Sequence, residues 1–140
     1  VLAGAANLWN LLDVVPGRAL KAFVPASALI AAGSGLWEIR LLLAVAAGEG
    51  IVLLFFDLRE RSMLGDSGAN ALGFIVGAGV VSTLSVPGLA AALGAIVVLH
   101  VVSETATLSR VIRAAPPIRW LDELGRIGPV SGEQPEQSSA

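Results

Sequence analysis

Apolar residues of this chain gather into long runs, and the polar residues fall mainly between them. The runs cover residues 1–12, 19–33, 36–56, 69–86 and 89–102. A membrane-spanning helix needs about 20 apolar residues, which the longest runs supply alone and the shorter ones with their flanks. We therefore expect an all-α, polytopic transmembrane helix bundle of about four spans, preceded by a partial first helix. Turns are expected at residues 16–17, 33–35 and 87–88, and a charged loop at residues 57–61.

Composition supports insertion into a membrane. Hydrophobic residues make up 55% of the chain and charged residues only 14%, whereas a soluble domain carries about 25% charged residues. The mean hydropathy is +0.79. The net charge of −2 gives no case for nucleic-acid binding, and the absence of cysteine excludes disulfides and thiolate metal sites. The chain starts at Val1 without Met and inside an apolar run, which predicts the cut end of a longer helix and hence a fragment.

The sequence changes character after residue 103. Residues 104–128 mix arginines with aliphatic residues and Trp120, a pattern typical of a segment at the membrane interface. A helix packed on the protein itself would give a similar pattern. Residues 129–140 are rich in Ser, Gln, Glu, Gly and Pro, which predicts disorder. We divide the chain into a transmembrane domain at 1–103, a cytoplasmic interfacial segment at 104–128 and a disordered tail at 129–140.

The basic residues predict the orientation of the four spans. One side carries Arg18, Lys21, Arg59, Arg61 and the arginines after residue 103. The other side carries only Glu38 and Arg40. The positive-inside rule makes the first side cytoplasmic. Asn7, Asn10, Asp13 and Asp66 are then expected at the same, cytoplasmic face.

Residues 63–70, Met-Leu-Gly-Asp-Ser-Gly-Ala-Asn, form a polar hinge between two apolar runs. Gly65 and Gly68 allow a tight turn and a close approach to a ligand. A helix expected to begin near Gly68 would offer its free N–H groups to phosphate, and Asp66 could hold Mg²⁺ beside them. The alternative is that Asp66 or Ser67 only caps that helix. Behind it, Gly73 and Gly77 have the spacing of a small-residue contact face between membrane helices.

Two motifs together resemble a known family. Asn7, Asn10 and Asp13 form an Asn-x-x-Asn-x-x-Asp pattern at a predicted helix end, and a Gly-Asp-x-Gly pattern follows at residues 65–68, two predicted spans later. The pair, in this order and with this spacing of spans, is similar to the polyprenyl-phosphate N-acetylhexosamine-1-phosphate transferases of glycosyltransferase family 4. The resemblance covers residues 1 to about 103.

The resemblance implies a function at the cytoplasmic face of the bacterial plasma membrane. A sugar-1-phosphate passes from a UDP-sugar to a polyprenyl phosphate such as undecaprenyl phosphate, with release of UMP, in the synthesis of cell-wall or surface-glycan precursors. Asp66 matches the Mg²⁺-binding aspartate, and Asp13 matches an aspartate near the nucleotide and the reacting phosphate. The expected substrate-binding residues are Asn7, Asn10, Gly65, Ser67, Gly68, Arg59 and Arg61. The expected partners are the lipid, the UDP-sugar and the membrane, and a homodimer is left open.

Departures from the family pattern keep two other functions open. Pro16 stands where the family has a second aspartate, and Val14 where it has glycine, so the chain could be a non-catalytic membrane homologue that acts through partner contacts. It could also be a transporter fragment with Glu49 as the coupling residue. A carboxylate at the centre of a membrane helix costs about 2.5–3.5 kcal/mol, so we expect Glu49 to face other helices. For His100 we expect a structural role with its hydrogen bonds satisfied.

Overall fold

The computed structural model describes residues 1–59, 61, 64–105, 117, 120 and 124. Five helices follow one another: α1 (Leu2–Leu12), α2 (Arg18–Gly33), α3 (Trp37–Asp57), α4 (Gly65–Thr83) and α5 (Val86–Thr105). Every regular element within these described ranges is a helix, as predicted. Most of the interfacial segment and all of the tail predicted from the sequence lie outside the described residues.

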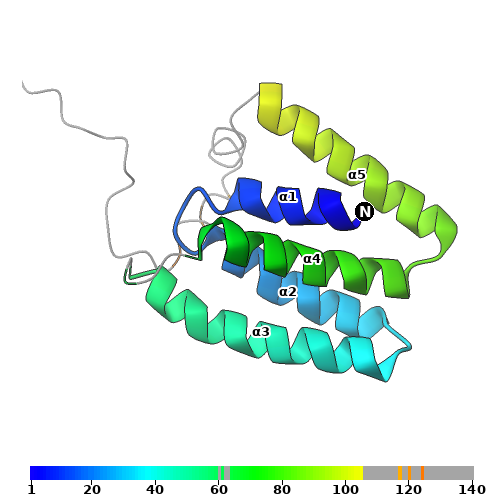
Figure 1. Ribbon diagram of the computed structural model, residues 1–140, viewed down its shortest axis with the longest axis horizontal. Helices are drawn as coiled ribbons and strands as arrows, with labels where there is room; N and C mark the ends of the chain where they lie inside the picture. Colours follow the sequence, from blue (N-terminus) through cyan, green and yellow to red (C-terminus); the bar gives the residue numbers. More distant parts are fainter. Residues whose placement is uncertain (60, 62–63, 106–116, 118–119, 121–123, 125–140) are drawn as a thin grey trace, which may run out of the picture.

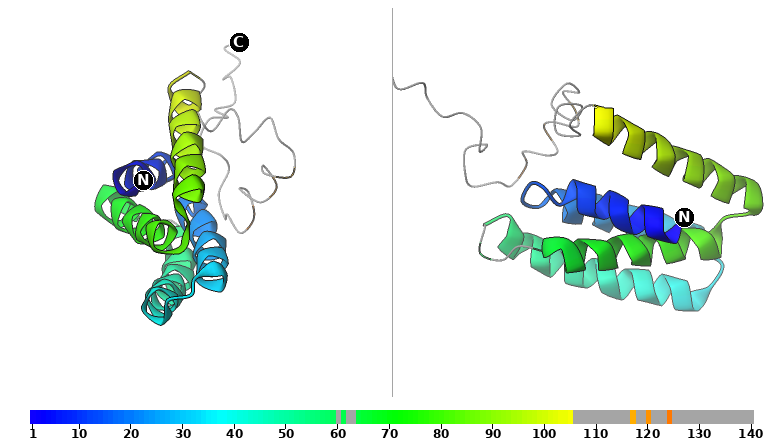
Figure 2. Two further views of the ribbon diagram at one scale, coloured as in Figure 1. Left: turned by 90° about the vertical axis from the view of Figure 1, so that its right-hand side faces the viewer. Right: turned by 45° about the horizontal axis from the view of Figure 1, so that its top comes forward.

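The first four helices pack as a bundle, and α5 lies against one side of it. In Figure 1, α4 lies between α1 and α2, and α3 packs on the far side of α2. The fifth helix contacts mainly α1 and is inclined to the other helices, as both views of Figure 2 show. The core is formed by Trp9, Ala19, Leu20, Phe23, Ala46, Leu72 and Val76. These residues come from α1 to α4, so the part of the bundle that sets the position of the polar motifs does not depend on α5.

Two of the helices are long and apolar enough to cross a membrane by length and composition. They are Trp37–Asp57 in α3 and Val86–Ser103 in α5, each with a hydropathy of 2.1. Only 17% of the α3 segment and none of the α5 segment is buried inside the bundle, so most of their apolar side chains face outward. Extended apolar surfaces of this kind mark contact with a membrane or with another protein. Two of the four predicted spans are thus supported; spans in α2 and α4 remain predictions.

Three predicted boundaries are wrong. The α4 helix begins at Gly65 and not near Gly68, so Asp66 lies inside its first turn and the helix has no side-chain cap from its own N-cap residue, Leu64. Pro87 and Gly88 are not a turn but belong to the first turn of α5, a position that proline tolerates because its missing N–H has no partner there anyway. Asp57 is the last residue of α3 and not part of a loop.

Glu49 does not face the other helices, contrary to the prediction. The inward face of α3 is formed by Leu43, Ala46 and Gly50, at intervals of three and four. Because successive helical residues are about 100° apart, a residue next to Gly50 cannot share that face. Glu49 is exposed on the outer surface of the bundle.

Candidate functional site

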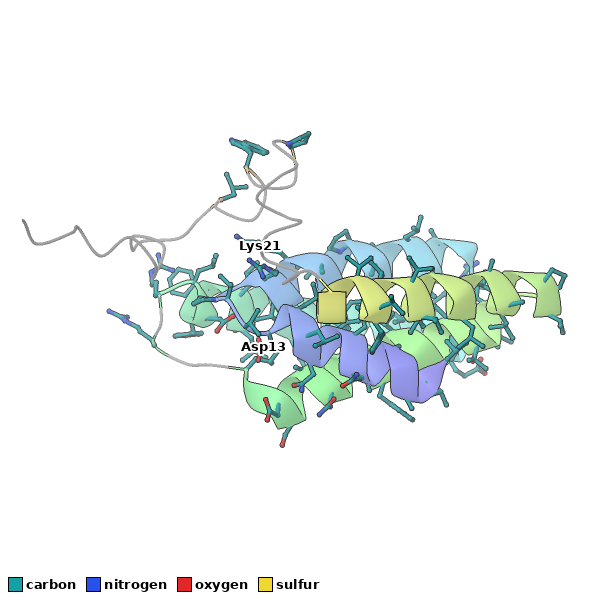
Figure 3. All side chains as sticks on the ribbon, turned by 90° about the horizontal axis from the view of Figure 1, so that it is seen from above. Asp13 and Lys21 are labelled. Atoms are coloured by element: carbon teal, nitrogen blue, oxygen red, sulfur yellow. The ribbon has the colours of Figure 1, made fainter. Side chains whose placement is uncertain are left out.

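Charged residues from four helices gather at one end of the bundle. This is the end where α1 and α3 finish and where α2 and α4 begin. Figure 3 shows Asp13 and Lys21 at this end, from the turn after α1 and from the first turns of α2. Asp13 of the first motif and Asp66 of the second are distant in sequence, but they lie at the same end of the molecule.

Close packing between α1 and α4 brings the two motifs together. A Cβ atom on Gly73 would overlap the carbonyl oxygen of Ala5 and lie 2.6 Å from the Cα of Ala6. A Cβ on Gly77 would lie 3.2 Å from the Cα of Leu2. The predicted small-residue contact face is therefore confirmed, and it lies against the backbone of α1. Since later residues of α4 contact earlier residues of α1, the two helices run antiparallel, and the C-terminal end of α1 lies beside the N-terminus of α4.

Asp13 lies directly at that N-terminus. Its carboxylate accepts a hydrogen bond from the backbone of Gly65, the first residue of α4, which has a positive φ of 68°. Its own backbone N–H bonds to the carbonyl oxygens of Trp9 and Asn10 at 3.1 and 3.2 Å, which ties it to the last turn of α1. Asp13 thus contributes from another helix the kind of contact that the sequence assigned to Asp66 or Ser67.

Three carboxylates influence one another here. Burial raises the pKa of Asp13, the negative charges of Asp57 and Asp66 raise it further, and the hydrogen bond from Gly65 opposes these effects. Charged carboxylates near one another repel, and a bound cation or nearby cationic side chains reduce this repulsion. Two basic residues begin α2 at this same end, Arg18, which is buried, and Lys21.

The carboxylates at this end of the bundle are oxygen donors of the kind that magnesium prefers. Among the residues that the structure describes, no three His, Cys, Asp or Glu side chains are close enough to hold a metal ion by themselves. Mg²⁺ commonly takes only one or two carboxylates and completes its shell with water and substrate phosphates. Asp66 is exposed in the first turn of α4, so its carboxylate can meet a ligand from solution. This donor set fits a magnesium ion that arrives with a phosphorylated substrate.

Asp57 is a further carboxylate at this end of the bundle, and the sequence did not predict its contact. Its side chain is only 5% exposed, and its Oδ2 accepts a hydrogen bond from the backbone N–H of Gly17 at 2.7 Å. The contact joins the end of α3 to the turn between α1 and α2. Its position at the end of an apolar run indicates a carboxylate at the membrane interface. Its contact with Gly17 joins residues 40 positions apart, so no local sequence pattern predicts it.

The two asparagines of the first motif have different surroundings. The Nδ2 of Asn7 lies 2.8 Å from Nε2 of His100 on α5. The Nδ1 of His100 lies 2.8 Å from the carbonyl oxygen of Ile96, which can only accept, so Nδ1 carries the proton and Nε2 accepts from Asn7. Both ring nitrogens of His100 thus have hydrogen-bond partners, as predicted, and its structural role stays a prediction. The Oδ1 of Asn10 is buried and lacks a hydrogen-bond partner within the described part of the chain.

Of the two arginines predicted to bind phosphate, Arg59 and Arg61, the structure shows Arg59 packed on the last turn of α3. The guanidinium of Arg59 stacks 3.5 Å from the centroid of the Phe55 ring, and it donates to the Phe55 carbonyl oxygen at 3.1 Å. It therefore covers the last turn of α3. Arg61 is exposed. Ser67 is also exposed, and Gly68 lies close enough to Leu64 that a Cβ there would be 2.7 Å from the leucine Cδ1.

Comparisons with known proteins find similarity to a transferase. No family model matches the chain, and no solved structure matches it. The chain is 32% identical over 126 residues to the phospho-N-acetylmuramoyl-pentapeptide-transferase of Desulforamulus reducens. The match covers 83% of this chain and 38% of that transferase, so the chain spans less than half the length of the curated relative it matches. This similarity supports a distant relationship to that transferase.

Proposed function

We propose that the chain is part of a membrane transferase that moves a sugar-1-phosphate from a UDP-sugar to polyprenyl phosphate and releases UMP. The observation that carries the proposal is the meeting of the two motifs at one end of the bundle. Asp13 from the first motif accepts a hydrogen bond from Gly65 of the second, and Asp66 raises the pKa of Asp13. The distant relative is named a phospho-N-acetylmuramoyl-pentapeptide-transferase, and this relationship supports transfer of a phosphorylated sugar.

The residues of the site suit phosphoryl transfer, which depends on positioning and on the neutralisation of charge. In our proposal Asp66 holds Mg²⁺, which when bound neutralises charge on the pyrophosphate of the nucleotide sugar. The N–H groups at the start of α4 donate hydrogen bonds to phosphate oxygens, since a helix N-terminus attracts anions. Asp13 would lie beside the reacting phosphate, and Asn7, Asn10, Ser67 and Gly68 would contact the substrates.

The setting of the proposed reaction is the cytoplasmic face of the bacterial plasma membrane. The outward-facing apolar surfaces of α3 and α5 support insertion. The end of the bundle that carries Asp13 and Asp66 also carries Arg18 and Lys21, and basic residues at helix ends favour the cytoplasmic side. A lipid phosphate and a soluble nucleotide sugar can meet only at such an interface.

A charge-removing substitution tests the proposal. In the complete natural protein, Asp66→Asn should lower Mg²⁺-dependent release of UMP from a UDP-sugar and undecaprenyl phosphate by about 100-fold or more, the size of loss seen when a group that stabilises a transition state is removed. Asn keeps the size of the side chain, so folding should be unchanged. Glu38→Gln is the matched control, because Glu38 is an exposed carboxylate at the opposite end of the bundle, in the first turn of α3. Equal turnover in the two variants would contradict the proposal.

One observation keeps a non-catalytic homologue as the second candidate. Pro16 precedes Gly17 in the turn after Asp13, at the position of the second aspartate expected from the family. An unmutated protein that binds no UDP-sugar and releases no UMP would favour this candidate. The transporter alternative has less support, because Glu49 is exposed on the outer face of α3 and lines no space between the described helices.

A further inference from the structure

We propose that Asp57 is a positioning residue for Asp13. Its buried carboxylate holds the turn between α1 and α2 through the backbone of Gly17, and so sets where Asp13 lies relative to the N-terminus of α4. The part of this inference that concerns turnover rests on the proposed function, whereas the part that concerns the turn does not.

The contact between Asp57 and Gly17 is a strong local restraint. Both residues are buried, and the distance from the Gly17 nitrogen to Oδ2 is 2.7 Å. A buried carboxylate is costly unless it is hydrogen-bonded, and a bond from a backbone N–H to an ionised oxygen is among the stronger hydrogen bonds. Loss of the acceptor would leave a buried N–H unsatisfied, so the turn would have to move to find water or another partner.

Gly17 has a backbone conformation and a close contact with α3 that require a glycine. Its φ is 75°, in the left-handed region that favours glycine. A Cβ atom there would lie 3.2 Å from Cγ of Leu58 and 3.3 Å from Cδ1 of Leu54. The backbone of the turn therefore rests directly on the last turn of α3, with the N–H aimed at the Asp57 carboxylate.

Asp13 lies at the other end of the same short turn. Its backbone N–H is bound to the last turn of α1, while Gly17 is bound to Asp57. Only residues 14–16 lie between these two fixed points, and the ring of Pro16 restricts the backbone further. Movement of the turn would therefore displace Asp13.

Asp57 acts through the turn and not on a substrate. Its exposed fraction is only 5%, and its Oδ2 already accepts a hydrogen bond from the backbone N–H of Gly17. Asp66, by contrast, is exposed. Of the three carboxylates, Asp57 is the one whose surroundings suit a restraint.

A distance measurement tests the restraint without any assay of activity. The chain has no cysteine, so paired cysteines for spin labels can be placed at Val14, which is 65% exposed, and at Asn70, which is exposed on α4. With the natural Asp57, double electron–electron resonance should give one narrow distance distribution. We expect Asp57→Ala to broaden or shift it and Asp57→Asn, which keeps an acceptor oxygen, to preserve it. A control pair at Gly35 and Ser85, at the opposite end, should be unchanged in all three proteins.

Kinetics in the complete natural protein test the consequence for turnover. Misplacement of a reacting group costs up to about 100-fold, so we expect Asp57→Ala to lower kcat by about 10- to 100-fold, with KM for the UDP-sugar changed much less. Asp57→Asn should restore most of kcat. Should Asp57→Ala fail to fold, Asp57→Ser replaces it, because its shorter hydroxyl cannot span the same distance.

The outcomes separate the two proposals. An unchanged Val14–Asn70 distance in Asp57→Ala would overturn the inference whatever the activity. A changed distance with unchanged kcat would overturn the role of Asp57 in turnover. A parent protein that releases no UMP would contradict the proposed function, while the distance measurement would still decide whether Asp57 holds the turn.

Discussion

Asn7 on α1 and His100 on α5 share a hydrogen bond of 2.8 Å although 93 residues separate them. One turn earlier on each helix, a Cβ on Gly4 would lie 2.7 Å from Cγ2 of Ile96, so the same side of α1 is packed closely against α5. No residue of α5 is buried within its apolar candidate span. We therefore expect this hydrogen bond to help hold α5 at its angle to the other helices.

The Asn7–His100 pair should be energetically coupled. A hydrogen bond contributes about 0.5–1.5 kcal/mol to stability, and we expect a coupling energy of that size in a double-mutant cycle of Asn7→Ala and His100→Ala. Unfolding of the four proteins in detergent micelles measures it. Additive effects, within about 0.3–0.5 kcal/mol, would mean that the contact contributes nothing to the attachment of α5.

The glycine face of α4 should not tolerate a methyl group. Gly73→Ala would bring its Cβ against the backbone of Ala5 and Ala6, and we expect it to destabilise the bundle by about 1–3 kcal/mol. Gly48→Ala is the matched control, because nothing lies within 4 Å of a Cβ at that helical position. There the gain in helix propensity should stabilise by about 0.5–1 kcal/mol. Thermal unfolding of both variants gives the two signs, and equal signs would contradict the close α1–α4 packing.

Local pattern was sufficient to predict the helices, because each of them consists largely of one of the apolar runs. The same reasoning found the contact face of Gly73 and Gly77, since small residues four apart are on one side of a helix. It misplaced the start of α5 because Pro87 and Gly88 suit both a turn and the first turn of a helix.

Contacts between distant residues had no local signal. The sequence predicts that Asp66 or Ser67 caps α4, yet the Gly65 backbone donates its hydrogen bond to the carboxylate of Asp13, at the end of α1. Asp57 lies in a run of charged residues that predicted a solvated loop, but burial and the contact with Gly17 depend on the packing of α2 against α3. The outward position of Glu49 likewise depends on which side of α3 contacts α2.

The orientation in the membrane can be tested by labelling of single cysteines. Cysteines at Ser67 and Ser103 should react with an impermeant thiol reagent only from the cytoplasm, because both lie at the end of the bundle that carries the basic residues. Ser34 was the obvious position for the opposite side, but it is fully buried. Gly35 is exposed and has nothing within 4 Å of a Cβ, so a cysteine there is the better reporter. Labelling of residues 35 and 67 from the same side would exclude the four-span arrangement.

The raised pKa of Asp13 predicts how stability depends on pH. The folded chain holds the Asp13 proton more tightly than the unfolded chain, whose pKa is near the usual 3.8. The free energy of unfolding therefore falls as the pH rises above that value, and the charged carboxylate lowers stability at neutral pH. We expect Asp13→Asn to be at least as stable as the parent at about pH 7 and to lose this advantage as the pH approaches 3.8. A difference in Tm that grows on acidification would contradict this sign.

The same substitution should affect turnover in a different way. If Asp13 acts mainly on the reacting phosphate, Asp13→Asn in the complete natural protein should lower kcat for UMP release by more than it weakens nucleotide binding, since interactions made only in the transition state appear in kcat. Asn can still accept the hydrogen bond from Gly65, so the start of α4 should keep its geometry. Glu38→Gln is the comparison, because Glu38 is exposed at the opposite end of the bundle, in the first turn of α3. If Asp13→Asn raises KM and leaves kcat unchanged, Asp13 acts in ground-state binding of the nucleotide. If the variant is both stable and fully active, the only remaining role of Asp13 is to cap α4.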